Sequence, residues 1–205
     1  MQHGQSFRIL ALGDSYTIGE GVLPEHRWPN LLAEYIRTAG ISCEVPVLIA
    51  QTGWTTDELQ DAFIAEKLNP HVDVITLLIG VNNQYRGQDP SVYRRSLASL
   101  FQVIRSSYPK TLLLVLPIPN WGQTPFASGR DRAKITSEIK EFNQINREQA
   151  IQFGALWIHE LEMEAEVVPP AEWIVEDGLH YTNKVYTQWA RVVYDTWCTE
   201  NFSSV

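Results

Sequence analysis

The sequence predicts a three-layered α/β fold with a mostly parallel central sheet, and three observations lead to this prediction. Five short apolar runs recur along the 205 residues, and amphipathic segments with helical spacing lie between them. Two of the runs are apolar almost throughout, which is typical of strands covered on both faces of a parallel sheet. Because strand and helix alternate, the pattern is that of an α/β sandwich.

The five expected strands are short and are spread along most of the chain. They span Phe7–Gly13, Glu44–Ala50, Val72–Gly80, Thr111–Pro119 and Ala155–Leu161. The third and fourth are the nearly continuous apolar runs, so we expect them to be buried on both faces.

The expected helices carry apolar side chains three and four residues apart, which gives each of them one apolar face. They span Pro29–Thr38, Thr56–Leu68, Pro90–Ser107, Asp131–Phe153 and Asn183–Cys198. The second helix opens with Thr55-Thr56-Asp57-Glu58, a sequence typical of a capped helix start.

Two stretches have no regular pattern, and both follow the carboxyl end of an expected strand. They are Asn120–Arg130 and Glu162–Leu179. Ligands bind at that edge in open α/β sheets, and long loops there often carry function. No repeat, low-complexity tract or linker divides the chain, so we expect one domain over residues 1–205.

Composition and charge narrow the class of protein. Hydrophobic residues make up 44% of the chain and charged residues 20%, as in ordinary globular proteins. The 16 Lys and Arg against 24 Asp and Glu give a net charge of −8, which disfavours binding to nucleic acid or to an anionic membrane surface. The apolar runs are too short to insert into a membrane, and the N-terminus does not look like a secretory signal. We therefore expect a cytoplasmic protein with a small-molecule substrate.

The cysteines and histidines indicate no metal site. Cys43 and Cys198 are too few for a zinc site and imply no disulfide framework. His3, His26, His71 and His159 do not stand at ligand spacing from another histidine, a cysteine or a carboxylate. We expect neither a metal nor another cofactor.

The first apolar run ends in Gly13-Asp14-Ser15, and Ser15 is the candidate nucleophile. A serine hydroxyl is a weak nucleophile until a base takes its proton, and a serine after a strand is commonly a helix cap or turn residue. The candidate base is His180, and Asp177 stands three residues before it, where a carboxylate would fix the imidazole tautomer. The alternative for Glu176–Asn183 is a surface turn that leads into the last helix.

Two other segments carry groups that stabilise an oxyanion. Asn82 follows the buried run that ends in Gly80, and its amide is a suitable donor. Gly53 follows the second strand, and a glycine lets its backbone N–H approach a ligand closely. The alternative for each segment alone is an ordinary turn. All of them, however, are expected at the same carboxyl edge of the sheet as Ser15 and His180.

This ordered set resembles the SGNH hydrolase family, also called GDSL esterases and lipases, over essentially the whole chain. The four matching blocks are Gly13-Asp14-Ser15, Gly53, Gly80-Val81-Asn82 and Asp177-Gly178-Leu179-His180. The resemblance implies a flavodoxin-like α/β/α sandwich with five parallel strands. It also implies that Ser15 is the nucleophile, and that the N–H groups of Ser15 and Gly53 and the Asn82 amide form the oxyanion hole.

The chain departs from the family pattern in two places. Tyr16 follows Ser15 where many members have leucine, and Ala50-Gln51-Thr52 precedes Gly53 where an asparagine often occurs. The chain also lacks Gly-x-Ser-x-Gly, so the nucleophile elbow of the larger α/β-hydrolases does not apply.

Several side chains near the candidate site are interpreted as lining an apolar pocket or packing at its rim. The pocket candidates are Asp14, Tyr16, Trp54, Tyr85, Trp121 and Trp173, with Phe126 and His26 as further ones. Arg86 is expected to be solvated or ion-paired at the surface. His159 alternates with Trp157 and Leu161 and is expected to be a structural strand residue.

The function favoured by these residues is hydrolysis of a carboxylic ester through an acyl-enzyme on Ser15. A short acyl or O-acetyl group is preferred, because no long cap insertion is evident. Two alternatives remain at this point: a lysophospholipase or thioesterase-type lipid acyl hydrolase, and a non-catalytic flavodoxin-like ligand-binding module. Against the second, Asp14 is ill suited to a position beside a phosphate.

Overall fold

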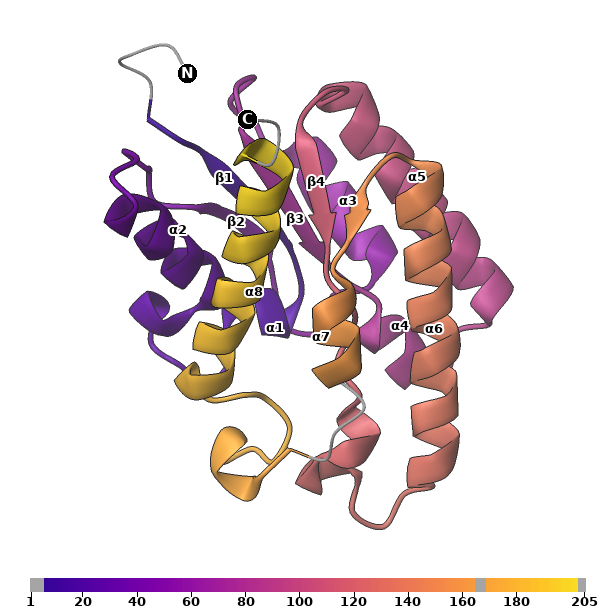
Figure 1. Cartoon of the computed structure of the whole chain (residues 1–205). Coiled ribbons are helices and arrows are strands. Elements are labelled where there is room, and N and C mark those ends of the chain that lie inside the picture. The colour runs from indigo at the N-terminus through magenta and orange to yellow at the C-terminus, as the bar shows by residue number, and fades with distance from the viewer. Residues whose placement is uncertain (1–5, 165–168, 203–205) are drawn as a thin grey trace.

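The computed structural model describes residues 6–164 and 169–202, and a five-stranded sheet forms its centre (Figure 1). The strands are β1 (Ile9–Gly13), β2 (Val47–Ala50), β3 (Val74–Leu78), β4 (Leu112–Val115) and β5 (Leu156–Trp157). They lie in the order β2-β1-β3-β4-β5, and every pairing is parallel. The α/β class and the five parallel strands are therefore confirmed.

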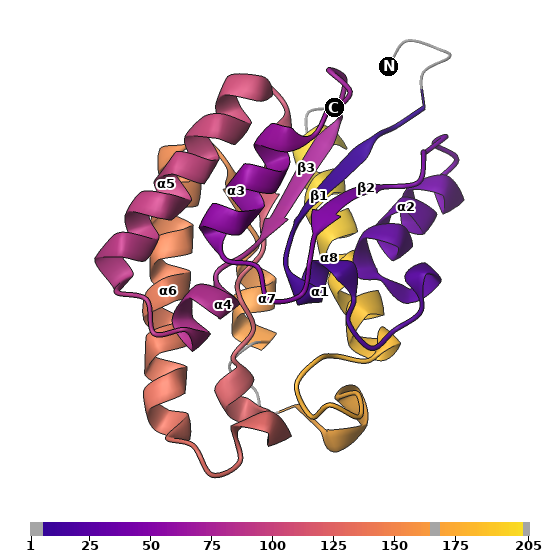
Figure 2. The ribbon, with the colours of Figure 1, turned by 180° about the vertical axis from the view of Figure 1, so that it is seen from behind.

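Helices cover both faces of the sheet. On one face α2 (Trp28–Thr38) packs against α8 (Asn183–Phe202). On the other, seen in Figure 2, α3 (Thr56–Ala65) contacts α5 (Pro90–Ser107), which in turn contacts α6 (Arg132–Gln152). These are the five helices that the apolar periodicity predicts, with closely similar bounds.

The core lies between the sheet and the two helical layers. Every residue of β1 and of β3 is buried, because both faces of these strands are covered. From the helices, Trp28, Leu32 and Phe101 are among the fully buried side chains. Complete burial of one such side chain contributes about 1.5–3 kcal/mol to stability. The start of α3 is capped as expected, since the Thr55 N–H donates to a Glu58 carboxylate oxygen at 2.7 Å.

Each of the five predicted strands is longer than the one that forms, and the difference is largest in proportion for the fifth. Pairing with β4 ends at Trp157, and α7 (His159–Glu164) begins two residues later. The interpretation of His159 as a strand residue is therefore wrong. Glu160 and Glu162 lie in the first turn of α7, where carboxylates favour a helix. The His159 side chain is 60% exposed and contacts Glu162.

Short helical segments form where the sequence predicts turns or loops. They include α1 (Ser15–Ile18), α4 (Val81–Tyr85) and the 3₁₀ turns η1 (Pro24–His26), η2 (Trp121–Gln123), η3 (Pro125–Ala127) and η4 (Ala171–Trp173). All of them except η1 and η4 contain a residue that lines the cleft described below. Residues 165–168 of the predicted loop 162–179, and His3, lie outside the described residues.

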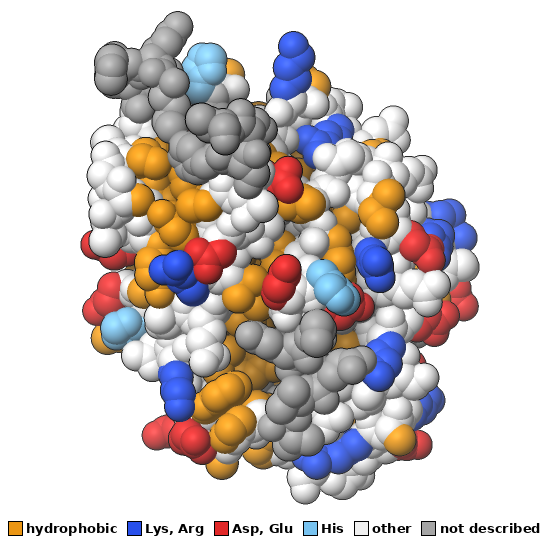
Figure 3. All heavy atoms as spheres, viewed as in Figure 1, with side chains coloured by type: hydrophobic (Ala, Val, Ile, Leu, Met, Phe, Trp, Pro, Cys, Tyr) orange, Lys and Arg blue, Asp and Glu red, His pale blue; other side chains and the backbone are white. Residues whose placement is uncertain are grey.

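Figure 3 shows the face of the molecule that carries α7 and α8. Hydrophobic side chains form several patches on this face, and acidic and basic side chains are scattered among them. Within the described residues, no helix has the length and apolarity needed to cross a membrane.

Candidate active site

Ser15 lies at the start of α1, directly after the carboxyl end of β1. A Cβ atom added to Gly13 would come within 2.1 Å of the Thr17 Oγ1 and 2.5 Å of the Leu78 carbonyl oxygen, so only glycine fits this turn. Asp14 caps the helix, because its Oδ1 accepts a hydrogen bond from the Tyr16 N–H at 3.0 Å. The turn thus fixes the Ser15 side chain at the carboxyl edge of the sheet.

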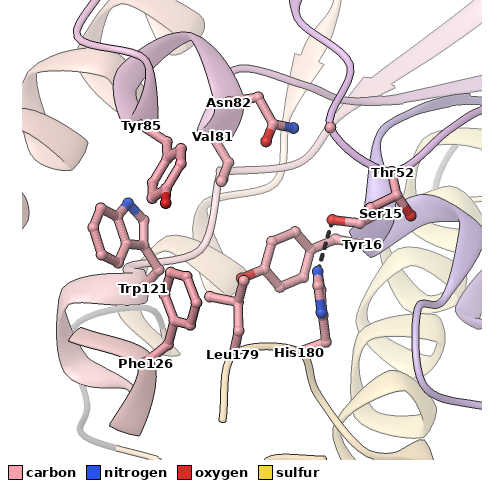
Figure 4. A pocket seen from close by; sticks show the side chains of 11 residues that line it. Ser15, Tyr16, Thr52, Val81, Asn82, Tyr85, Trp121, Phe126, Leu179 and His180 are labelled. Atoms are coloured by element: carbon pink, nitrogen blue, oxygen red, sulfur yellow. Dashed lines mark hydrogen bonds between the residues drawn. The ribbon is translucent and has the colours of Figure 1, made fainter. Parts of the chain in front are cut away.

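His180 reaches Ser15 from a loop just before α8. Its Nε2 lies 2.8 Å from the Ser15 Oγ, and both side chains are buried to within a few per cent of their area. On the other side of the ring, Nδ1 lies 2.5 Å from the Asp177 Oδ2. Serine, imidazole and carboxylate therefore form one hydrogen-bonded series. Figure 4 shows the contact between Ser15 and His180.

The Asp177 carboxylate is held by its own loop. Its Oδ1 accepts hydrogen bonds from the N–H groups of Leu179 at 2.8 Å and His180 at 2.9 Å. Partial burial acts to raise the pKa of Asp177, but hydrogen bonds from the His180 ring and from these two N–H groups outweigh it and lower the pKa. The carboxylate is accordingly ionised at neutral pH, next to the imidazole.

Asp14, which precedes Ser15, has a raised pKa, in contrast to Asp177. Its side chain is fully buried, and its Oδ2 has no hydrogen-bond partner among the described residues. Burial raises the pKa of Asp14 to about 7, against the opposing effect of the hydrogen bond from the Tyr16 N–H. Asp14 does not line the cleft, so its place in the structure is that of a helix cap beneath Ser15.

Asn82 and Gly53 lie across from Ser15 and His180, as Figure 4 shows for the Asn82 side chain. The Asn82 Nδ2 donates to the Trp54 carbonyl oxygen at 2.9 Å, which leaves its second hydrogen available. The Gly53 carbonyl oxygen accepts from the Arg86 guanidinium at 2.6 Å. Arg86 also pairs with Glu58 at 3.3 Å, as expected for an ion-paired surface arginine. The segment that carries the Gly53 N–H is thus held through two carbonyl groups, that of Trp54 by Asn82 in α4 and that of Gly53 by Arg86 directly after α4.

A cleft of about 160 Å³ opens beside these groups. It is lined by Ser15, Tyr16, Thr52, Gly53, Val81, Asn82, Tyr85, Trp121, Phe126, Leu179 and His180. Tyr85, Trp121 and Phe126 form the end of the cleft away from Ser15 and are called here the aromatic wall (Figure 4). Their ring centroids lie 5.4–6.2 Å apart.

Some predicted pocket residues lie elsewhere. Trp54 contributes only its backbone, through the bond to Asn82. Trp173 belongs to η4 and has Lys184 above its ring. Neither these two nor His26 lines the cleft, whereas Tyr16, Tyr85 and Trp121 do.

The sequence reasoning missed three of the lining residues. Val81 and Leu179 lie inside matched blocks, at the positions where any residue is allowed, so the blocks gave no signal for them. Thr52 lines the opposite side, and its hydroxyl donates to the Glu20 carboxylate. Within the described residues, no group of three or more His, Cys, Asp or Glu side chains is arranged to hold a metal ion.

A serine, a histidine and a carboxylate in hydrogen-bonded series at the carboxyl edge of a parallel sheet define an α/β serine hydrolase. Residues 11–188 match the GDSL-like lipase/acylhydrolase family, and the chain belongs to that family. The resemblance found in the four sequence blocks is thereby confirmed. The protein is a serine hydrolase of carboxylic esters, and the alternative of a non-catalytic ligand-binding module is wrong.

Individual relatives agree with this assignment. An arylesterase of Vibrio mimicus is 27% identical over 177 residues, which cover 85% of this chain and 80% of the relative. Among solved structures, the lipase/acylhydrolase from Enterococcus faecalis has a TM-score of 0.73 at 19% identity, with 93% of this chain and 94% of that chain covered. AlinE4, an SGNH-hydrolase family esterase, has a TM-score of 0.69 at 18% identity, with 98% and 99% covered. The structural likenesses support the fold.

Proposed function

We propose that Ser15 attacks the carbonyl carbon of an ester while His180 accepts its proton, and that Asp177 orients and stabilises the imidazolium. The observation that carries this proposal is the hydrogen-bonded series from Ser15 Oγ through His180 to Asp177, at 2.8 and 2.5 Å. A bond forms between Oγ and the acyl carbon, and the alcohol leaves with the proton that His180 held. Water then repeats the sequence on the acyl-enzyme and regenerates Ser15.

The negative charge of the tetrahedral intermediate requires donors on the face opposite His180. We assign these to the N–H groups of Ser15 and Gly53 and to the free amide hydrogen of Asn82. Support comes from the Asn82 amide, which faces the cleft and is oriented by the Trp54 carbonyl, and from Arg86, which holds the Gly53 carbonyl. Such preorganised donors need no rearrangement as charge develops.

The substrate we propose is an ester of a short acyl group. The cleft volume of about 160 Å³ lies well below the roughly 300–1,000 Å³ that drug-sized ligands occupy. In the acyl-enzyme the acyl group is bonded to Ser15, and we assign it to the cleft between Val81, Leu179 and the aromatic wall. A cleft of this size favours short acyl or O-acetyl esters. It disfavours the long-chain substrates of a lysophospholipase or thioesterase-type lipid acyl hydrolase.

The test is turnover of p-nitrophenyl esters by the wild type and by Ser15→Ala. We expect the variant to fold as the wild type does, since it loses one small side-chain oxygen, and to lose turnover by at least about 10³-fold. Retention of full activity in Ser15→Ala would reject the assignment. A series from acetate to octanoate separates the two acyl classes, because a lipid acyl hydrolase prefers the long members.

Two broader expectations remain predictions. One domain over residues 1–205 is supported by the family match, which extends across residues 11–188. A cytoplasmic location is supported by Cys43 and Cys198, which are both free thiols, as is usual in a reducing compartment.

A further inference from the structure

Arg130 makes one unusual set of contacts behind the cleft. The carbon at the centre of its guanidinium lies 5.3 Å from the ring centroid of Tyr85, 5.4 Å from that of Trp121 and 5.2 Å from that of Phe126. Nearly equal distances place the cation over the middle of the triangle that the three rings form. Arg130 itself does not line the cleft, so any effect on the substrate passes through the aromatic wall.

The guanidinium of Arg130 interacts with the three rings and not with an acidic side chain among the described residues. It donates a hydrogen bond to the Tyr85 hydroxyl at 3.3 Å. Within the part of the chain that the structure describes, no carboxylate forms an ion pair with it. A cation over an aromatic ring is attracted by the electron-rich face. Three rings thus provide the attraction that an acidic partner provides for most surface arginines.

The three rings differ in how firmly the rest of the protein holds them. Trp121 is buried, and its Nε1 donates to the Gln84 side chain at 2.6 Å, which in turn donates to Glu138 at 2.8 Å. Tyr85 is 47% exposed, and its hydroxyl accepts the hydrogen bond from Arg130. Phe126 is half-buried and carries no polar group on its ring. Arg130 therefore acts chiefly on Tyr85 and Phe126, and holds both of them against the fixed Trp121.

We propose that Arg130 is a positioning residue that sets the upper limit of acyl length. By drawing the three rings together it keeps the far end of the cleft closed, so a longer acyl chain meets the aromatic wall. This inference rests on the proposed function, because it requires the acyl group on Ser15 to point toward that wall. Without the cation, Tyr85 and Phe126 are free to separate, and the cleft extends between them.

The experiment measures kcat and KM on p-nitrophenyl esters from acetate to octanoate for the wild type, Arg130→Ala and Arg130→Lys. In the wild type we expect kcat/KM to fall toward octanoate. In Arg130→Ala the ratio of kcat/KM for octanoate to that for acetate should rise by roughly tenfold, through a lower KM for octanoate. Arg130→Lys keeps a cation near the rings and should retain most of the wild-type selectivity.

A matched control is Arg191→Ala. Arg191 is also an exposed arginine above two rings, those of Tyr35 and Tyr194, but these rings do not line the cleft. Its removal should leave the chain-length profile unchanged, which separates a specific effect from loss of a surface cation.

Several outcomes overturn the proposal. These are an unchanged chain-length ratio in Arg130→Ala, an equal loss on all esters, and a wild type that already prefers octanoate. If Arg130→Ala does not fold, Arg130→Met decides the question, since it fills much of the same space without a charge. Absence of Ser15-dependent turnover in the wild type would reject the proposed function itself, whereas normal turnover with an unchanged profile in the variants rejects only the role of Arg130.

Discussion

The Nε2 atom of His180 lies 2.8 Å from the Oγ of Ser15, although 165 residues separate the two in the sequence. The contact exists because β1 ends where the loop before α8 returns to the same edge of the sheet. That loop is attached to the aromatic wall, since the Phe126 N–H donates to the Gly178 carbonyl oxygen at 2.8 Å. The base and the far end of the cleft are thus parts of one connected surface.

Asp177→Asn should lower kcat by about 10⁴-fold, the cost that a wrong histidine tautomer has in serine proteases. The asparagine oxygen would still accept from the N–H groups of Leu179 and His180, so the loop keeps its form. Its amide nitrogen would then face the His180 Nδ1, which must become an acceptor. The proton moves to Nε2, and the ring no longer accepts the Ser15 proton.

The measurement is kcat on p-nitrophenyl acetate, with circular dichroism as the check on folding. Asp195→Asn is the matched control, because Asp195 is an exposed carboxylate on α8 that pairs with Arg191 at 2.9 Å. Wild-type kcat in Asp177→Asn would mean that His180 needs no carboxylate for its orientation.

Asn82→Ala should lower kcat by about 10²- to 10³-fold with little change in KM. The amide hydrogen that does not bond to Trp54 is the donor we assign to the oxyanion, and the charge is present only after Ser15 has attacked. Its removal therefore affects the transition state more than the bound ester. A rise in KM at constant kcat would instead make Asn82 a residue of ground-state binding. Steady-state kinetics on a short-chain ester distinguishes these results.

Much of the fold was predictable from local pattern. β1 and β3 are buried at every residue, and such strands appear in the sequence as continuous apolar runs. The apolar runs overestimate the strands, most of all β4 and β5, because the extent of a strand depends on pairing with its neighbour, a tertiary limit that apolarity does not encode. The helix at Val81–Tyr85 was missed because five residues are too few to show helical periodicity.

The candidate site was predictable to the extent that its residues fall in recognisable blocks. Ser15, His180 and Asp177 come together as expected, and Tyr85 and Trp121 line the cleft. Trp173 does not, although it too lies in a loop after a strand, because loop direction is decided by packing and not by composition. Arg130 gave no signal, although it shares the loop 120–130 with Trp121 and Phe126, since its contact with Tyr85 of α4 and the grouping of the three rings arise only in the folded chain.

Gly80→Ala should lower the free energy of unfolding by about 3 kcal/mol or more. Gly80 has a φ of 128°, and an added Cβ would lie 2.2 Å from the Tyr93 hydroxyl oxygen. Tyr93 has little room to move, because it is fully buried and its hydroxyl donates to the Asn146 amide oxygen at 2.5 Å. Gly80 is therefore required for packing against Tyr93, independently of the role of Asn82 as a donor to the oxyanion.

Urea unfolding of Gly80→Ala measures this cost, and Gly87→Ala is its control. Gly87 has a φ of 70°, but no atom lies within 4 Å of the position its Cβ would take. Its substitution should cost only the backbone strain, about 1–2 kcal/mol. Equal losses in the two variants would show that the contact with Tyr93 contributes nothing.

The contribution of Asp14 to the stability of the protein should fall as the pH rises from about 4 to about 7. Burial raises the pKa of Asp14 from 3.8 to about 7, so the folded state keeps a proton in this range that the unfolded state has already released. Where the folded state binds more protons, the free energy of unfolding decreases with pH. A shift of this size corresponds to about 4 kcal/mol of the free energy of unfolding, which is lost between pH 4 and pH 7. Above pH 7 the contribution of Asp14 no longer changes with pH.

Asp14→Asn isolates this contribution. The asparagine oxygen still accepts from the Tyr16 N–H, as the Asp14 Oδ1 does at 3.0 Å, but the side chain no longer titrates. Urea unfolding at pH 4 and at pH 8 gives the change in stability for each protein. From pH 4 to pH 8 the free energy of unfolding should fall by up to about 4 kcal/mol more in the wild type than in the variant. The other titrating groups are common to both proteins and cancel in this difference. The same pH dependence in both would mean that Asp14 is ionised in the folded state, and that its buried carboxylate has a partner that stabilises the charge.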